Sequence, residues 1–324
     1  IRILNSRCVY KSGLSRSEDV IVKVAVLGEC MIELSQQVGD QFKIGFGGDT
    51  LNTAIYLCRC NGEADYFTAL GNDPYSQSML NAWQDEGVGI EHVKIKNNTL
   101  PGLYIINNDE DGERHFQYWR QNSPARTLLS DYPSVLDEIK SYEMIFLSGI
   151  TLSLYPQDDL IVFFNCLTQY RKQGGIVVFD NNYRPRNWMG MDTAVQVFSK
   201  MMTLTDIALI SFDDEKSLYG EHSVEQCINR WVDAGVEEVV VKNGHHGCHL
   251  YKDKQHEFYP LKSVLKPVDT TAAGDSFNGA YLAAKLQSKD IKDCISAGQQ
   301  CASTVIMHKG AIIERNIALT DGGS

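Results

Sequence analysis

Several features that would assign this chain quickly to a class are absent from its 324 residues. No apolar run approaches the roughly 18 residues that a membrane-spanning helix needs, so no membrane association is expected. The pattern GxxxxGK[ST] of phosphate-binding P-loops does not occur, which excludes that class of nucleotide site. The nine cysteines include no CxxC pair, and this scattered arrangement fits reduced thiols in a cytoplasmic protein better than a disulfide framework.

Positive charge is also scarce. The chain has 30 Lys and Arg residues against 41 Asp and Glu residues, which gives a net charge of −11. Broad electrostatic attraction to nucleic acid or to an anionic membrane is therefore not expected. An anionic substrate would need a local group of basic side chains that works against the overall field. Hydrophobic residues make up 43% of the chain, which is ample for the core of one large α/β domain.

The sequence does contain short apolar runs that alternate with helix-like stretches. The alternation predicts a parallel sheet with helices on both faces, a three-layer α/β/α fold. We expect one domain over residues 21–318, a leader or appended segment over residues 1–20, and a tail over residues 319–324. The runs that indicate strands buried on both faces are 22–27, 144–147, 175–179, 206–210 and 238–241. The stretches that indicate helices are 49–59, 75–86, 156–173, 191–202 and 223–234.

Two parts of the chain, near residues 29–46 and 100–120, do not follow this alternation of strands and helices. Together they predict a small antiparallel sheet outside the main layer, a β lid. The second part indicates a hairpin, because its middle is rich in Asn, Asp and Gly. A sheet of this kind covers a site or forms an interface with a second subunit, and its aromatic face suggests a homodimer. The predicted lid strands are 30–34, 42–44, 102–106 and 114–119.

The stretch DTTAAGD, from Asp269 to Asp275, places small residues at the start of a predicted helix. Small residues leave backbone N–H groups uncovered, and with the helix dipole these groups form an anion site. The N–H groups of Ala272, Ala273 and Gly274 would hold a transferring phosphoryl group, and Asp275 would be the base for the attacking hydroxyl. We expect an unusual φ at Gly274. The alternative is a tight turn in which Asp275 only caps the helix.

The stretch GFGGDTLN, residues 45–52, precedes another predicted helix. Asp49 and Asn52 are about one helical turn apart, so both can face one site. Gly47 and Gly48 would let a polyol lie against the backbone, where the two polar side chains can bind its hydroxyls. The alternative is a tight strand-to-helix turn with Asp49 as the N-cap.

These two stretches resemble the signatures of the carbohydrate-kinase family that includes ribokinase and fructokinase. Residues 269–275 match the pattern Asp-Thr-x-Ala-Ala-Gly-Asp, and residues 47–52 match a Gly-Gly pair followed by an Asn on the next helix. Within the family, the stretches GECMIEL, GFGGDTLNT, LPGLY, YWR and FDNNYRPR are similar to those of the 2-keto-3-deoxygluconate kinases. The resemblance implies a ribokinase-like fold and a cytoplasmic enzyme of sugar-acid catabolism. It would use ATP and Mg²⁺ to phosphorylate 2-keto-3-deoxygluconate (KDG) on its terminal 6-hydroxyl.

The resemblance also assigns residues to the two substrates. Aromatic residues in a small sheet can instead serve packing, and an arginine after a strand is often a surface ion-pair partner. The residues implied for the sugar acid are Gly47, Gly48, Asp49, Asn52, Tyr104, Tyr118, Arg120, Arg184 and Asp275. Those implied for ATP are Asn182, Arg184, Lys242, Gly244, Gly247, Ala272 and Gly274.

An Asn-x-x-Glu motif of many family members, which organises magnesium-bound water, is incomplete here. Phe212 stands in place of the Asn, so only Glu215 is left to act on magnesium through water.

Two other functions stay open. A kinase of the same fold could act on a neutral sugar such as fructose or ribose, and it would have no need for Arg120 and Arg184 in its pocket. A catalytically inactive relative could bind sugar or nucleotide as a regulator, although the intact Asp275 argues against it. Release of ADP with a panel of sugar acids separates these alternatives.

Overall fold

The structure is a computed structural model that describes residues 22–37, 39–108, 114–220 and 222–319. The expected leader, the turn of the predicted hairpin and all but the first residue of the expected tail lie outside the described residues. No helix within the described ranges is long and apolar enough to cross a membrane.

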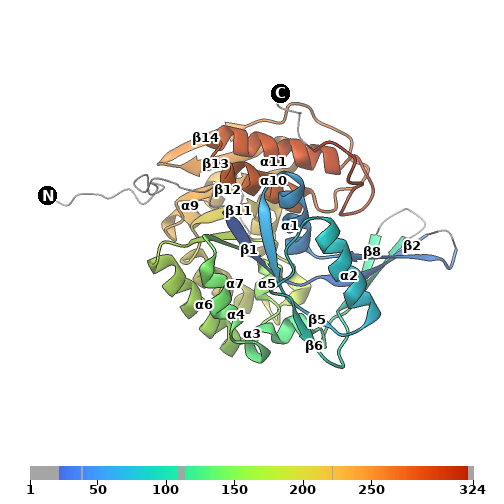
Figure 1. The fold of residues 1–324 in the computed structure, drawn as a ribbon. Coiled ribbons are helices and arrows are strands. Elements are labelled where there is room, and N and C mark those ends of the chain that lie inside the picture. The colour runs from blue at the N-terminus through green and yellow to red at the C-terminus, as the bar shows by residue number, and fades with distance from the viewer. Residues whose placement is uncertain (1–21, 38, 109–113, 221, 320–324) are drawn as a thin grey trace, which may run out of the picture.

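The centre of the molecule is an eight-stranded sheet whose strands come largely from the apolar runs (Figure 1). Six neighbouring strands are parallel, as the alternation of strands and helices predicts. Helices cover both faces of these strands, which explains why the runs are continuously apolar. In order across the sheet the six strands are β12 (Glu238–Lys242), β11 (Ile207–Ser211), β10 (Ile176–Asp180), β9 (Met144–Ser148), β1 (Lys23–Leu27) and β4 (Glu63–Phe67).

One edge of the sheet departs from the expected parallel arrangement. β13 (Cys248–Lys252) and β14 (Gln255–Tyr259) form an antiparallel hairpin that continues from β12. Asp253 and Lys254 in its turn both have a positive φ, as a two-residue hairpin turn often requires. Most side chains of β14 are exposed. This strand therefore lacks the apolar run by which the buried strands are predicted.

Two groups of helices sandwich the sheet, each around its own hydrophobic core. Local chemistry sets their starts: α2, for example, begins at Pro74 after Asp73, whose side chain accepts from two backbone N–H groups. One face carries α1 (Asp49–Arg59), α2 (Pro74–Asp85), α10 (Ala273–Leu286) and α11 (Ile291–Val305). The other carries α3 (Leu128–Asp131), α4 (Val135–Glu138), α5 (Gly149–Leu152), α6 (Gln157–Lys172), α7 (Met191–Met202), α8 (Phe212–Tyr219) and α9 (Val224–Asp233).

The lid is a four-stranded sheet that projects from one side of the molecule (Figure 1). Its order is β3 (Phe42–Gly47), β2 (Met31–Gln36), β7 (Leu103–Asn108) and β8 (Arg114–Trp119). β2 and β7 pair in parallel, so the lid is a mixed sheet rather than the antiparallel one expected. The two hairpins are antiparallel, but they come from distant parts of the chain and meet through strands that run the same way. A parallel pair of β5 (Ala69–Gly71) and β6 (Lys94–Lys96) lies outside both sheets.

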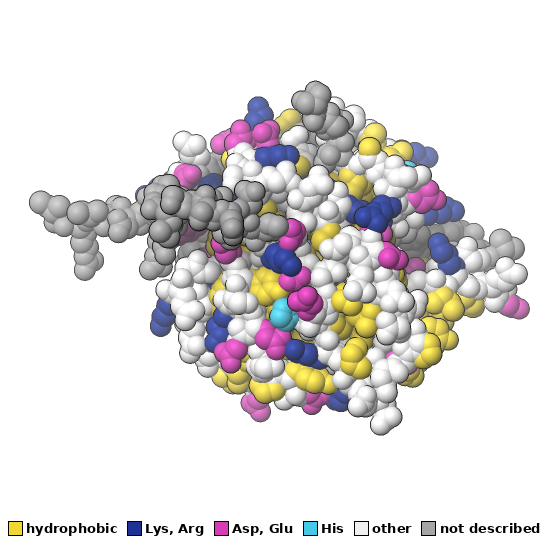
Figure 2. Space-filling model, viewed as in Figure 1, with side chains coloured by type: hydrophobic (Ala, Val, Ile, Leu, Met, Phe, Trp, Pro, Cys, Tyr) yellow, Lys and Arg dark blue, Asp and Glu magenta, His cyan; other side chains and the backbone are white. Residues whose placement is uncertain are grey.

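On the face drawn in Figure 2, Lys and Arg side chains lie among Asp and Glu side chains, so the charges of the two signs are interspersed there.

The carboxyl ends of the central strands, the starts of α1 and α10, and the lid all meet around one cavity. Ligands of open α/β sheets gather at this end of the strands. The fold therefore brings together the motifs that the sequence places far apart.

Candidate active site

A cavity of about 1050 Å³ lies between the lid, the strand ends and the start of α10. Ligand pockets commonly have about 300–1,000 Å³, so this one has room for two small substrates. Of the site residues predicted from the sequence, all line the cavity except Glu215: Gly47, Gly48, Asp49, Asn52, Tyr104, Tyr118, Arg120, Asn182, Arg184, Lys242, Gly244, Gly247, Ala272, Ala273, Gly274 and Asp275.

The start of α10 presents backbone N–H groups to the cavity. Ala272 precedes the helix in the left-handed region, with φ 59° and ψ 16°. The expectation of an unusual φ at Gly274 is wrong, because the left-handed turn comes two residues earlier. The N–H of Ala273 donates to the carbonyl of Thr270 at 3.2 Å, so the turn itself uses this group. Within the described part of the chain, no hydrogen bond uses the N–H groups of Ala272, Gly274 or Asp275.

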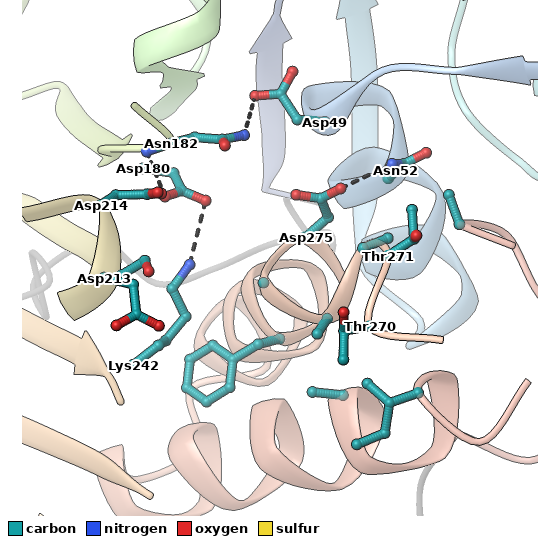
Figure 3. Close-up of a pocket in the computed structure, with 18 of the residues that line it drawn as sticks. Asp49, Asn52, Asp180, Asn182, Asp213, Asp214, Lys242, Thr270, Thr271 and Asp275 are labelled. Atoms are coloured by element: carbon teal, nitrogen blue, oxygen red, sulfur yellow. Dashed lines mark hydrogen bonds and ion pairs between the residues drawn. The ribbon is translucent and has the colours of Figure 1, made fainter. Parts of the chain in front are cut away.

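Asp275 lies in the first turn of α10 and points into the cavity (Figure 3). Its Oδ2 accepts a hydrogen bond from Nδ2 of Asn52 at 2.8 Å. Burial, together with the nearby carboxylates of Asp49 and Asp180, raises the pKa of Asp275 to about 8, although the hydrogen bond from Asn52 and the charge of Lys242 oppose the rise. A carboxyl group with a pKa near neutrality can take a proton from a hydroxyl and release it again.

Asn182 links Asp49 and Asp180 beside the cavity through two further hydrogen bonds (Figure 3). Nδ2 of Asn182 donates to Oδ2 of Asp49 at 2.7 Å. The backbone N–H of Asn182 donates to Oδ1 of Asp180 at 3.2 Å. Burial and the charge of Asp180 raise the pKa of Asp49. Asn182, which the family resemblance implies for ATP, thus lies against a residue implied for the sugar.

The glycines before α1 have a structural reason that differs from the one expected. A Cβ on Gly47 would lie 2.2 Å from the hydroxyl oxygen of Tyr104, and one on Gly48 would lie 2.2 Å from the carbonyl oxygen of Glu29. Both glycines line the cavity, but a side chain at Gly48 would clash with the backbone before β2, and one at Gly47 would displace the hydroxyl of Tyr104.

Three polar side chains on the lid side of the cavity, those of Arg120, Tyr104 and Tyr118, are each held by a polar partner. Arg120 forms an ion pair with Glu29, which is 2% exposed. The hydroxyl of Tyr104 donates to Glu33, and burial raises the pKa of this tyrosine above its ordinary value. The hydroxyl of Tyr118 accepts from Arg186, whose guanidinium carbon also lies 4.0 Å from the centre of the Tyr118 ring. These contacts fix the wall of the cavity on the lid side.

The opposite end of the cavity carries acidic and basic side chains from β10 to β12. Arg184 donates to Oδ1 of Asp214 at 3.0 Å and to the carbonyl of Tyr183 at 2.8 Å. Lys242, the last residue of β12, donates to Asp180. Gly244 and Gly247, with φ of 52° and 100°, shape the loop that follows β12.

The structure does not place Glu215 in the cavity. Its side chain is fully buried, and Oε1 accepts from Nδ2 of Asn181 at 3.0 Å. Phe212, in place of the family Asn, packs into the hydrophobic core beneath α8. Instead, Asp213 and Asp214 in the first turn of this helix line the cavity.

Several polar residues of this region were not predicted as site residues: Glu29, Asp180, Asp213, Asp214 and Asn278. The position of Asp180 at the end of a buried strand was the signal that could have found it. Asp213 and Asp214 follow β11 in the same way. Nothing in the local sequence marks Glu29 or Asn278, whose partners are distant along the chain.

Comparison with protein families agrees with the geometry. The model of the pfkB family carbohydrate kinase matches residues 22–317. The chain belongs to this family. The 2-dehydro-3-deoxygluconokinase of Escherichia coli strain K12 is 43% identical over 303 residues, which cover 90% of this chain and 97% of the relative. The expected family is therefore confirmed.

Solved structures of the family share the fold. A fructokinase from Vibrio cholerae O395, in a form with fructose, ADP and calcium ion bound, is 25% identical and has a TM-score of 0.78, covering 90% of this chain and 95% of that chain. A putative ribokinase II from E. coli in complex with ATP and Mg²⁺ is 20% identical and has a TM-score of 0.76, covering 90% of this chain and 94% of that chain. The expected ribokinase-like fold with a small β lid is confirmed.

Proposed function

We propose that this kinase transfers the γ-phosphoryl group of ATP to the 6-hydroxyl of 2-dehydro-3-deoxy-D-gluconate, which is KDG, and releases ADP and the 6-phosphorylated sugar acid. The observation that carries the chemistry is the pairing of Asp275 with uncommitted backbone N–H groups at the start of α10. The relatives named 2-dehydro-3-deoxygluconokinase, which are 37–43% identical over 90% of the chain, support the choice of substrate.

Asp275 takes the proton of the attacking hydroxyl as the new O–P bond forms. The N–H groups of Ala272 and Gly274 have no hydrogen-bond partner among the described residues, and both residues line the cavity. They can donate to the phosphoryl oxygens as these gain charge, and donors already in place need no reorganisation. Asn52 holds the carboxylate of Asp275 with an amide, which orients it without neutralising it. Asp49 and Asn182 lie beside it, where they can bind hydroxyl groups of the sugar.

The nucleotide is expected at the end of the cavity formed by the loop after β12. Gly244, Gly247, Lys242 and Arg184 line this end. Asp213 and Asp214 offer oxygen ligands there, and Mg²⁺ in such sites typically uses one or two carboxylates, waters and the nucleotide phosphates. The metal would neutralise charge on the phosphates during transfer. The complex of ATP and Mg²⁺ named for the E. coli ribokinase II supports both cofactors.

The lid end has donors and acceptors that fit a sugar acid. Nε of Arg120 and Oε1 of Glu29 are both buried and have no hydrogen-bond partner among the described residues. The two residues line the cavity and are joined through their other atoms. A substrate carboxylate can accept from the guanidinium of Arg120, and a substrate hydroxyl can donate to Glu29.

ADP release with a panel of substrates tests this function. KDG, its galactonate epimer, gluconate, fructose and ribose would be compared at equal concentration with Mg²⁺ and ATP. We expect turnover with KDG to exceed turnover with either neutral sugar by more than tenfold. A preference for fructose or ribose would reject the sugar-acid assignment, and ADP release with none of the five would reject the kinase assignment.

We also propose a homodimer formed through the lid. Large apolar side chains are exposed on both edge strands, Phe42 and Ile44 on β3 and Trp119 on β8. A second copy of the lid would cover them. Sedimentation of the wild type and of Ile44→Lys tests this proposal, because a charge in the interface should give a monomer.

A cytoplasmic location agrees with the free thiols of all eight described cysteines.

A further inference from the structure

Lys242, at the end of β12, belongs to a closed ring of hydrogen bonds beside the cavity. Its Nζ donates to Oδ2 of Asp180 at 3.2 Å and to Oδ1 of Asn278 at 3.0 Å. Nδ2 of Asn278 donates to the same Asp180 oxygen at 2.6 Å. Asn278 is fully buried, and Asp180 is 4% exposed. Two buried side chains therefore fix the position of one ammonium group.

The place of Asn278 in the fold links this ring to the anion site. Asn278 lies on α10 three residues after Asp275, close to one turn further along the helix. It does not line the cavity, whereas Asp180 and Lys242 do. Asn is a weak helix former, and a buried amide is stable only when it is hydrogen-bonded. Both ends of this amide are bonded to residues that face the cavity.

The ammonium group of Lys242 lies beside the start of α10. A Cβ on Gly274 would be 3.4 Å from Nζ, so the cation is next to the residue whose N–H faces the phosphoryl position. Figure 3 shows Lys242 extending from β12 toward Asp180, across the space opposite Asp275. A cation in this position can contact the oxygens of a phosphoryl group held at the anion site.

We propose that Asn278 is a positioning residue which, with Asp180, holds the ammonium group of Lys242 toward the phosphoryl group during transfer. The proposal rests on the proposed kinase activity and deepens it. Without Asn278, the lysine keeps one side-chain partner of two and gains freedom to leave the phosphoryl position. Asn278 would then act on the rate through Lys242 and not by touching either substrate.

The same arrangement has a consequence for the base. The titratable groups that face Asp275 are Asp49 and Tyr56 on α1, Asp180 on β10 and Lys242 on β12. Among them, Lys242 is the one whose charge favours ionised Asp275. Removing that charge should therefore raise the pKa of Asp275, and displacing it should raise the pKa less. A residue with a merely structural role would leave this pKa unchanged.

Two variants and a matched control test the proposal. Lys242→Met keeps the aliphatic stem and removes the charge. Asn278→Ala removes the amide and suits a helix. The control is Tyr281→Phe, one turn further along α10, which removes a buried hydroxyl that donates to Glu238 at 2.5 Å and lies outside the cavity. The measurements are kcat, KM for each substrate, the pH dependence of kcat, and thermal unfolding.

We expect Lys242→Met to lower kcat by about 10²–10³-fold, as the loss of a donor to a developing charge does. Asn278→Ala should lower kcat by about tenfold, because one charged hydrogen bond that holds the lysine is lost. The acidic limb of the pH profile should move to higher pH in both, and further in Lys242→Met. Tyr281→Phe should unfold at a lower temperature than the wild type while its kcat and pH profile stay unchanged.

Wild-type kcat and pH profile in Asn278→Ala would overturn the positioning role, and the same result in Lys242→Met would overturn the role of the cation. Failure of the proposed function would give a different result, because the wild type itself would then release no ADP with any sugar acid. In that case titration calorimetry with ATP and with ADP decides. A preference for ATP over ADP that is unchanged in both variants overturns the proposal, and a preference that is lost in both supports it.

Discussion

The two ends of the cavity hold their carboxylates in different ways. At the start of α10, Asp275 accepts from the amide of Asn52. At the lid, Glu29 is paired with the guanidinium of Arg120. An amide donates a hydrogen bond but carries no charge, whereas a guanidinium neutralises its partner. The repulsion from Asp49 is therefore left in place at the first end, and it adds to burial in raising the pKa of Asp275.

This difference follows what each end has to do. A base must accept a proton, so a cation bonded directly to it would lower its pKa and remove that ability. A binding site for an anion must not repel it, so the charge of Glu29 has to be balanced before a carboxylate can enter. If this is so, substitutions at the α10 end should change kcat, and substitutions at the lid end should change the affinity for the sugar acid.

The largest effect is expected from Asp275→Asn. The amide keeps the size of the side chain and can still accept from Asn52, but it cannot take a proton. We expect kcat to fall by about 10²–10⁴-fold, the range typical of the loss of a general base, with little change in the binding of ATP. Steady-state kinetics and calorimetry measure the two quantities. A variant that keeps more than about a tenth of the wild-type kcat would remove Asp275 from this role.

Gly274→Val should also act mainly on the rate. The φ of Gly274 is not in the left-handed region, so a side chain there is not excluded by backbone strain. Its Cβ would lie 3.4 Å from Nζ of Lys242, and a branched side chain would fill the phosphoryl space. We expect kcat to fall by about 10²–10³-fold while circular dichroism stays that of a folded protein. An active variant would show that the phosphoryl group does not approach Gly274 closely.

Much of the fold could be predicted from the sequence because most central strands are buried on both faces and leave continuous apolar runs. β4 escaped prediction because two acidic residues interrupt its sequence, EADYF, so it forms no continuous apolar run. β13 and β14 escaped because the outer strand is largely exposed. The parallel pairing of β2 with β7 depends on how two distant hairpins meet, which no local pattern encodes.

In the candidate site, too, local features could be predicted from the sequence, whereas contacts between distant residues could not. The anion site at α10 could be predicted because small residues before a helix are a local feature. The partners of its side chains could not, because Asn278 and Asp180 are 98 residues apart, and Arg120 and Glu29 are 91 residues apart. Because glycine adopts the left-handed region most easily, the sequence predicts this turn at Gly274, but the structure has it at Ala272.

Arg120→Met tests the lid end. The variant keeps the alkyl stem and removes the charge that would receive the sugar carboxylate. Losing one partner of a charged pair in a closed site costs about 2–5 kcal/mol, which is more than tenfold in affinity. We expect the loss in KM for KDG, with KM for ATP little changed, because the carboxylate lies far from the transferring phosphoryl group.

The ion pair with Glu29 requires a control, since Arg120→Met also leaves a buried carboxylate without its cation. The double variant Glu29→Gln with Arg120→Met removes that charge and should recover thermal stability. We expect its KM for KDG to stay high. Recovery of KM together with stability would mean that Arg120 is structural, and that Arg184 or another group holds the carboxylate.

The smallest effect is expected in stability, and it separates the two ends most directly. The pKa of Asp275 is raised from 3.8 in the unfolded chain to about 8 in the folded protein. Between these values the folded state binds the proton more tightly than the unfolded state does. The stability contributed by protonated Asp275 is therefore fully present below about pH 4 and is lost as the pH rises through about 8.

Asn cannot ionise, so Asp275→Asn should not suffer this loss. We expect the variant to melt a few degrees higher than the wild type at pH 8, since about 1 kcal/mol corresponds to roughly 2–4 °C in domains of about 150–250 residues and to less in a larger one. At pH 4 the two melting temperatures should agree. Calorimetric melting of the ligand-free proteins across this range is the measurement. Melting temperatures that differ by the same amount at both pH values would show that the amide of Asn52 holds Asp275 as an ordinary, ionised carboxylate, and the contrast between the two ends would fail.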